Sequence, residues 1–114
     1  MTVSQKDINE AVDYIYSHGH KFAKAKGELT YLEEFRKSKK ALLMKTAMAN
    51  GVKTVAAAEV EAYADMEYIE LLKGIRAATE AAEALRWGLV AAQARIEVFR
   101  TVEASNRMMD RAAM

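Results

Sequence analysis

An unbroken heptad repeat in the last half of the chain constrains its fold more than any other feature. The first apolar position recurs every seven residues, at Tyr68, Ile75, Ala82, Leu89 and Ile96. The second follows three residues after each of these, at Leu71, Ala78, Leu85, Ala92 and Phe99. This spacing is typical of a helix that packs along another helix, and its alanines let the partner approach closely. We therefore expect a helix over about 66–112.

A second apolar stripe lies near the start of the chain. Its members alternate in spacing between three and four residues: Ile8, Ala11, Ile15, His18, Phe22, Ala25, Leu29 and Leu32. This alternation indicates one face of a helix. Ser4 followed by Asp7 resembles a helix N-cap, and Asn50-Gly51 resembles a left-handed C-terminal cap. The pattern predicts one long helix from about 5 to about 49.

Three other local signals complete the predicted helices. Thr54 can cap a short helix over 55–64, and Asp65 can cap the helix that carries the heptads. Gly27 marks a soft spot in the first helix, because a glycine costs about 1 kcal/mol relative to alanine inside a helix.

These elements predict an all-α fold in a single domain, 1–114. The sequence has no proline and only 5 glycines, so it lacks the frequent turn signals of a β-rich domain. A helix over 66–112 would span about 70 Å, at about 1.5 Å per residue. We therefore expect an elongated antiparallel hairpin of two long helices, with a short connecting helix and coiled-coil-like packing.

Several large apolar residues fall outside the heptad positions. A lone hairpin covers only one side of each helix, so these side chains need a neighbour: Leu72, Trp87, Val90, Val98, Val102, Met108 and Met109. Burial of both stripes requires the first helix to fold back on the third, other chains to cover them, or both. We expect a homo-oligomer and place Leu72, Trp87, Val90, Val98 and Met108 at its interface.

The residues that carry catalysis or bind metals are sparse. There is no cysteine, which excludes disulfides and thiol chemistry. His18 and His20 point in different directions on a helix, so they do not form a metal-binding pair. The carboxylate pairs resemble a solvated helical face, and no glycine-rich phosphate loop is present. We expect a protein that is not an enzyme and uses no cofactor or metal.

The chain shows no signal peptide and no apolar run of about 18 residues that could cross a membrane. We therefore expect a cytoplasmic protein without membrane contact, in the host cytoplasm if it is encoded by a phage.

The net charge of +1 hides two oppositely charged blocks. Residues 21–53 contain nine bases and three acids, a net charge of +6. Residues 54–83 contain two bases and seven acids, a net charge of −5. One surface of such a protein could meet a polyanion, and another a basic partner or the next subunit.

The basic block predicts a nucleic-acid surface. Its candidate residues crowd one helix, interleaved with aromatic rings that can stack unpaired bases: Lys21, Lys24, Lys26, Arg36, Lys37, Lys39, Lys40 and Lys45. Arg36 and Lys39 fall at positions of the apolar seam, so the helix either turns away from its partner there or offers these charges to a ligand. The alternative is a solvated lysine-rich face with salt bridges to the acidic stretch over 59–70.

The order of these segments resembles a known family. The lysine-rich helix contains Lys24-Ala25-Lys26-Gly27-Glu28-Leu29 and Arg36-Lys37-Ser38-Lys39-Lys40-Ala41-Leu42, and it ends at Asn50-Gly51. An acidic short helix with Ala64-Asp65 and a long final helix follow. This arrangement is similar to that of phage recombination mediators of the T4 UvsY type, and of related small helical early-region phage proteins, over roughly residues 10–105.

The resemblance implies a ring-like homo-oligomer that binds single-stranded DNA. Such a protein helps to load a strand-exchange recombinase onto strands coated by single-strand-binding protein. A Lys-x-Arg pair near the end of the lysine-rich helix contacts DNA in that family. Here Lys45 matches the lysine but Ala47 stands at the arginine position, and Lys39 and Lys40 could substitute for it.

The resulting hypothesis is a single-stranded-DNA-binding recombination mediator or accessory protein. The acidic stretch would contact a neighbouring subunit or the recombinase, through Glu59, Glu61, Glu67 and Glu70. One alternative is a phage interaction protein, a host-enzyme inhibitor or an assembly chaperone, that acts through this acidic face. Another is a structural component of the virion.

Overall fold

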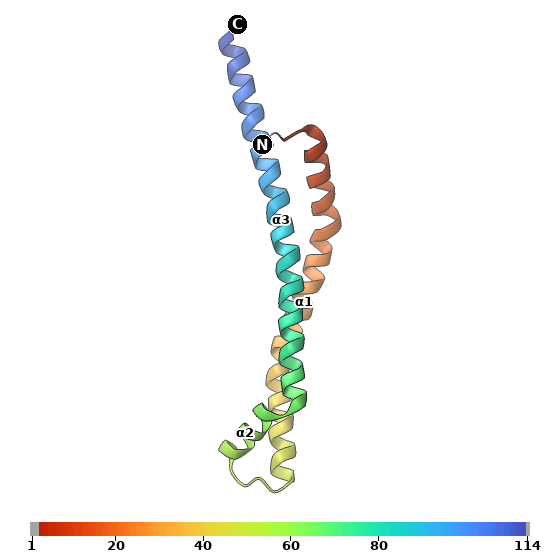
Figure 1. Ribbon diagram of the computed structural model, residues 1–114, viewed down its shortest axis with the longest axis vertical. Helices are drawn as coiled ribbons and strands as arrows, with labels where there is room; N and C mark the ends of the chain where they lie inside the picture. Colours follow the sequence, from red (N-terminus) through yellow and green to blue (C-terminus); the bar gives the residue numbers. More distant parts are fainter. Residues whose placement is uncertain (1–2, 114) are drawn as a thin grey trace. The chain divides into compact units, whose positions relative to one another are not determined.

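The computed structural model describes residues 3–113, and the described chain is built from helices alone (Figure 1). The three helices are α1 (Gln5–Ala49), α2 (Val55–Ala64) and α3 (Met66–Ala113). The predicted all-helical fold is confirmed, as are two long helices and a short one between them. The observed bounds differ from the predicted ones by one residue at most.

Side-chain caps fix where each helix begins. At the start of α1, the Asp7 N–H donates to Ser4 Oγ at 3.2 Å and the Ser4 N–H donates to Asp7 Oδ2 at 2.9 Å. Thr54 Oγ1 accepts from the Ala57 N–H at 3.1 Å, and Asp65 Oδ1 accepts from the Glu67 N–H at 2.8 Å. The three predicted N-terminal caps are confirmed, and they satisfy N–H groups that have no partner inside a helix.

The C-terminus of α1 is closed by a left-handed glycine. Gly51 has a φ of 104°, and the Val52 N–H donates to the Ala47 carbonyl at 3.1 Å. This six-to-one bond is the Schellman arrangement that Asn50-Gly51 predicts. In contrast, Gly27 does not interrupt α1, which continues through it.

The described chain consists of two compact units. The first joins residues 3–23 of α1 to residues 83–113 of α3. The second comprises residues 24–82, with the remainder of α1, all of α2 and the start of α3. Each long helix therefore contributes to both units, and each unit contains its own contact between α1 and α3.

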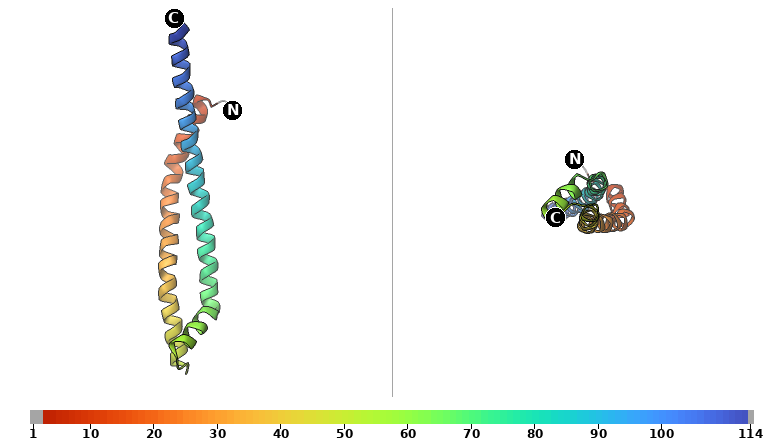
Figure 2. Two further views of the ribbon diagram at one scale, coloured as in Figure 1. Left: turned by 90° about the vertical axis from the view of Figure 1, so that its left-hand side faces the viewer. Right: turned by 90° about the horizontal axis from the view of Figure 1, so that it is seen from below.

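In the first unit, α1 and α3 lie side by side through small residues (Figure 2). Ala11 of α1 and Ala92 of α3 are almost completely buried, and Ile8 is nearly so. Tyr14 of α1 crosses α3 at Gly88, where an added Cβ would stand 2.9 Å from Tyr14 Cζ. Glycine at position 88 therefore allows the phenol ring to lie directly on the helix backbone. Residues beyond Glu103 on α3 are exposed.

In the second unit, α2 packs its alanine face against the pair of longer helices. Ala58 and Ala62 are fully buried, and Tyr68 of α3 is buried next to them. The rings of Tyr63 and Tyr68 meet edge to face, with centroids 5.4 Å apart. This is a favourable geometry for two aromatic rings.

The predicted seam of α3 is confirmed by its burial. Every one of the ten heptad positions from Tyr68 to Phe99 is buried or half-buried. Nevertheless, five of the seven buried side chains in residues 3–113 are alanines, and no larger side chain is fully buried there. The chain therefore forms its helix contacts by close approach and encloses little apolar volume. No helix of the described chain has the length and apolar character needed to cross a membrane.

Candidate nucleic-acid interface

Lys39 and Lys40, which the sequence places at the centre of the basic block, bind acidic residues of the same chain. Lys39 Nζ lies 3.3 Å from Glu67 Oε2, and Lys40 Nζ lies 3.6 Å from Glu59 Oε2. Both lysine side chains are largely covered, with 23% and 28% of their surface exposed. The structure therefore matches the alternative interpretation for these two residues, in which the lysines pair with the acidic stretch.

Lys40 is held by an aromatic ring as well as by a carboxylate. Its ammonium lies 4.6 Å from the centroid of the Tyr63 ring, a cation–π distance. The Tyr63 side chain, followed by Glu59, holds the pKa of Lys40 above its usual range. Lys40 therefore fastens α1 to α2 and stays charged over the physiological pH range.

The seam of α1 shifts by one residue at Arg36. Phe35 is half-buried where the sequence pattern would place Arg36, and the Arg36 side chain is exposed. An aromatic ring and not the guanidinium is therefore the half-buried side chain at this point of α1. Lys39 follows four residues later, with its charge met by Glu67.

The remaining predicted basic residues are all exposed. Lys37 pairs with Glu34 on its own helix at 3.2 Å, and both of these side chains face solvent. The others form no ion pair with any residue in 3–113: Lys21, Lys24, Lys26, Arg36 and Lys45. Because α1 turns about 100° per residue, these five are distributed around the helix and do not form one continuous patch.

Two of these free lysines share one side of α1 with an exposed aromatic ring. Lys24, Tyr31, Ser38 and Lys45 are spaced seven residues apart, and all four are exposed. Residues at this spacing lie on nearly the same side of a helix. The line from Lys24 to Lys45 is about 31 Å long, at about 1.5 Å per residue. We call these four residues the basic line.

The ring at the centre of the basic line is both exposed and supported. Tyr31 is 63% exposed, and its ring stacks on Phe35 with 6.1 Å between centroids and 9° between planes. Phe35 is half-buried, so it holds Tyr31 in place. The aromatic residues among the lysines were visible in the sequence. The seven-residue spacing of the basic line stands out only in the structure, where ion pairs occupy Lys39 and Lys40 and leave Lys24 and Lys45 unpaired among the described residues.

The acidic stretch is largely neutralised within the chain. Glu59 and Glu67 hold the two lysines of α1, and Glu70 pairs with Lys73 at 3.2 Å. Of the four predicted acidic contact residues, Glu61 is exposed and has no ion pair with a described residue. A partner that binds this acidic face would have to compete with lysines already present.

The five apolar residues predicted at an oligomer interface are all exposed: Leu72, Trp87, Val90, Val98 and Met108. Trp87 is 58% exposed, and its ring carries the Arg86 guanidinium 4.5 Å from the centroid. Arg86 is in turn bound by Glu83, which raises the pKa of this arginine. Exposure leaves these side chains free for a partner, as the hypothesis requires.

The two histidines lie apart from any cluster of metal ligands. The His18 ring stacks on Tyr14, with centroids 3.8 Å apart, and its Nδ1 lies 3.1 Å from the Tyr14 carbonyl oxygen. His20 is exposed. Within residues 3–113 no three potential metal ligands gather at one place.

No protein family, curated protein or solved structure matches this chain. The resemblance to phage recombination mediators therefore stays a prediction that rests on the segments quoted from the sequence.

Proposed function

We propose that this chain is a non-enzymatic accessory protein that binds single-stranded nucleic acid along the basic line of α1. The observation that supports the proposal is the combination of two unpaired lysines with an exposed, braced aromatic ring on one side of the helix. The binding surface is thus narrower than the predicted block. Lys39 and Lys40 form ion pairs between helices of the chain, whereas Lys24, Tyr31 and Lys45 would contact the nucleic acid.

The two residue types would perform different tasks. Lys24 and Lys45 would each meet a phosphate and release the counterions condensed on the strand. Tyr31 would stack on an unpaired base, which every base can accept because each has a π-face. Ser38 can donate a hydrogen bond to a phosphate oxygen between them. Recognition of this kind favours single strands, whose bases are accessible, and does not depend on sequence.

A salt series with a labelled single-stranded oligonucleotide tests the proposal by fluorescence anisotropy. Each lost phosphate contact lowers the slope of log K against log salt by about 0.7 for a single strand. The Lys24→Ala/Lys45→Ala variant should therefore lose about 1.4 from this slope and bind more weakly at low salt.

Lys26→Ala/Arg36→Ala is the matched control for this experiment, because both residues are unpaired with any residue in 3–113. It removes the same number of positive charges from exposed positions on another side of α1. Its slope should stay close to that of the unchanged protein. Equal effects of the two double variants would show that only total charge matters, and would remove the basic line as a site.

Replacing Tyr31 separates stacking from charge. Tyr31→Ala should weaken binding by about 1–3 kcal/mol, the usual contribution of one stacked base, while the salt slope stays unchanged. Tyr31→Phe keeps the ring and should retain most of the affinity. Variants of Lys39 and Lys40 are unsuitable here, because they also remove the ion pairs to Glu67 and Glu59.

The narrower role of a recombination mediator rests on the resemblance alone. It predicts that the protein speeds the loading of a strand-exchange recombinase onto DNA already coated by single-strand-binding protein. If the unchanged protein fails to bind an oligonucleotide even at about 50 mM salt, where such electrostatic contacts are strong, the nucleic-acid proposal is wrong. A role in protein binding, as an inhibitor, a chaperone or a virion component, then becomes the better hypothesis.

A further inference from the structure

A second line of regularly spaced residues runs along α3 in the first unit. Its spacings alternate between four and three residues, as in a coiled-coil seam: Ala84, Gly88, Ala91, Arg95, Val98 and Val102. These residues lie about 100° around α3 from the seam that faces α1. Five of them are exposed, and Gly88 is half-buried because Tyr14 crosses it. We call this line the second seam.

The second seam is ordered by size. Its first three members are the smallest residues available, and its last three are larger. If an identical helix runs antiparallel to α3 with its centre at residue 93, each larger residue meets a small one. Val102 would face the partner's Ala84, and Val98 would lie opposite the partner's Gly88, against the Tyr14 ring that already covers that glycine. Arg95 would face the partner's Ala91. A seam whose two halves complement each other fits a second copy related by a two-fold axis.

We infer that a second copy of this chain packs antiparallel against the second seam, and that the two-fold axis crosses α3 near residue 93. The small side chains of Ala84 and Ala91 leave space for knobs of the other helix. Each pairing occurs twice across the axis. In this arrangement α3 has α1 of its own chain on one side and the partner's α3 on the adjacent side, as in a four-helix bundle.

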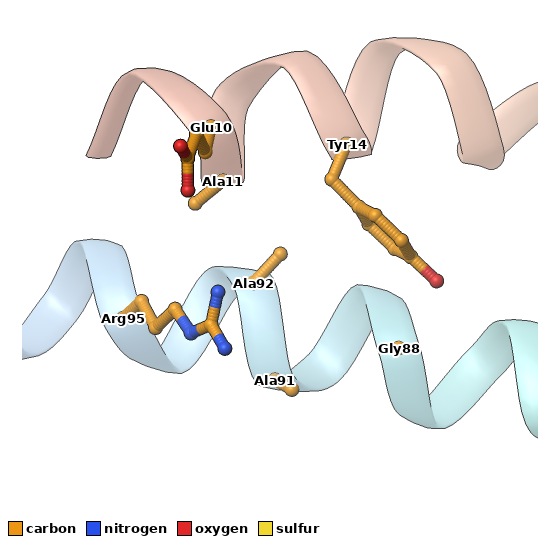
Figure 3. A pocket seen from close by; sticks show the side chains of 7 residues that line it. All are labelled: Glu10, Ala11, Tyr14, Gly88, Ala91, Ala92 and Arg95. Carbon is orange, nitrogen blue, oxygen red and sulfur yellow. The ribbon is translucent and has the colours of Figure 1, made fainter. Parts of the chain in front are cut away.

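A hollow beside the second seam supports this partner. It has a volume of about 230 Å³ and is lined by Glu10, Ala11, Tyr14, Gly88, Ala91, Ala92 and Arg95 (Figure 3). Glu10 comes from α1 and Arg95 from α3, and both lie toward the same end of the hollow. The partner's α3 would cover the open side of this space.

The charges at the proposed axis also fit a second copy. Arg95 is the one charged residue in the second seam, and neither it nor Glu10 forms an ion pair with any residue in 3–113. Asp7 lies close enough for Arg95 to help lower the pKa of its carboxyl, after the larger effect of Ser4. Near a two-fold axis, Arg95 of each chain comes within reach of Glu10 on the other, and the four charges sum to zero.

The chain as a whole exposes enough surface to leave room for an interface of this kind. The chain exposes 8535 Å². A compact monomer of 12.7 kDa would expose about 6,200 Å². The excess of about 2,300 Å² is comparable to the roughly 1,000–2,500 Å² that each copy buries in an obligate dimer. Exposed Val98 and Val102 form part of this excess.

Cysteine cross-linking tests both the contact and its direction, because the chain has no cysteine of its own. Ala84→Cys and Val102→Cys would be made as separate variants, each of a distinguishable mass, and mixed before mild oxidation. The antiparallel seam predicts a disulfide between the two variants and little disulfide within either one alone. A parallel seam would instead give disulfides within each variant alone and few between the two variants. That result would overturn the inferred register.

Gln93→Cys is the control for accidental contact. It lies at the level of the axis but on the opposite side of α3, so it should not form a disulfide-linked dimer. Light scattering on the unchanged protein should give at least twice 12.7 kDa. Val98→Lys should reduce this mass to that of one chain, whereas Gln93→Lys should not. A single chain for the unchanged protein, or equal behaviour of the two lysine variants, would overturn the inference.

A mixing experiment distinguishes contacts between chains from contacts within a chain. Glu10→Arg and Arg95→Glu should each weaken association, because each places like charges together at the axis. Mixing the two variants restores Glu–Arg pairs between chains while leaving like charges within each chain. Recovery of the dimer mass on mixing is therefore expected. If mixing does not restore it, the axis does not lie beside Arg95.

This inference is independent of the proposed nucleic-acid binding. Val98→Lys leaves the basic line of α1 unchanged, so oligonucleotide binding by this variant can be measured separately. Failure of the second seam would leave the proposed function open, and loss of DNA binding in the basic-line variants would leave the dimer mass unchanged.

Discussion

The two compact units join the same pair of helices by different chemistry. In the second unit, α1 meets α2 and α3 through charges, with Lys39 on Glu67 and Lys40 on Glu59. In the first unit, α1 meets α3 through Ala11 and Ala92, with no ion pair between the two helices among residues 3–113. The second unit has a third helix to cover the pair, and the first unit has only two.

A third helix therefore changes which surfaces of the helix pair stay open. In the second unit α2 supplies the third helix, buries Ala58 and Ala62, and pairs Glu59 with Lys40, whereas Lys24 and Lys45 form no ion pair with any residue in 3–113. In the first unit a hollow and the second seam stay uncovered. Large apolar side chains are exposed in both units, so each unit leaves apolar surface for a partner, and the paired lysines of the second unit are the residues least available for one.

The largest effect should come from the one large side chain that the second unit buries. Tyr68→Ala removes a ring that is 7% exposed and packed against Tyr63, and should cost about 3–5 kcal/mol of unfolding free energy. Tyr68→Phe keeps the ring and serves as the control. Urea unfolding followed by circular dichroism measures both. A loss below about 1 kcal/mol would mean that the contact of α2 with α3 contributes little.

The first unit should be more sensitive to added volume than to removed volume. Ala92→Leu places a larger side chain where α1 approaches most closely, and should cost about 1–3 kcal/mol. Ala94→Leu, an exposed position on the same helix, is the matched control and should be nearly neutral. If the same unfolding measurement showed equal effects, the close approach of the helices at Ala92 would be in doubt.

A smaller effect should reveal the contact between Tyr14 and Gly88. Gly88→Ala would normally stabilise a helix by about 1 kcal/mol, but here the added methyl group meets the Tyr14 phenol. We expect that gain to be absent in the unchanged background and to appear when Tyr14→Ala is also present. A double-mutant cycle measures the coupling. Additive effects would show that the ring does not rest on Gly88.

The smallest effect should be a dependence of stability on acid at the start of the first unit. Hydrogen bonds from the Ser4 N–H and hydroxyl lower the pKa of the Asp7 carboxyl below its ordinary value of 3.8. Because the folded pKa is depressed, this contribution is present above the unfolded value and is lost as pH falls through the lower folded value. The difference in Tm between the unchanged protein and Asp7→Ala should shrink over that acidic range. If the difference in Tm stayed constant over that range, ionisation of the Asp7 carboxyl would not be its cause.

Much of the fold followed from interactions between residues close together in the sequence. The caps at Ser4, Thr54 and Asp65 act within two or three residues, and Gly51 acts within the last turn of α1. The seam of α3 depends only on its own repeat. These features were predictable because a helix and its ends are set by neighbours along the chain.

The candidate site could be predicted only in part. The sequence located the basic block and its aromatic residues, but it left two interpretations of Lys39 and Lys40 open. The basic line of Lys24, Tyr31 and Lys45 became the better candidate after the other two lysines were found in ion pairs. Whether a lysine is exposed or ion-paired depends on which distant segment of the chain packs against it. The spacing of residues along one helix does not contain that information.

Three helices, their ends and the buried face of α3 could all be predicted from local patterns, because hydrogen bonds and apolar periodicity act between residues close together in the chain. The packing of the helices in space half-buries Phe35 where Arg36 was expected, brings Glu59 and Glu67 to Lys40 and Lys39, and lays Tyr14 on Gly88. Each of these contacts joins residues far apart in the chain. Their existence depends on the turn at Gly51 and on the register between helices, which no single helix specifies.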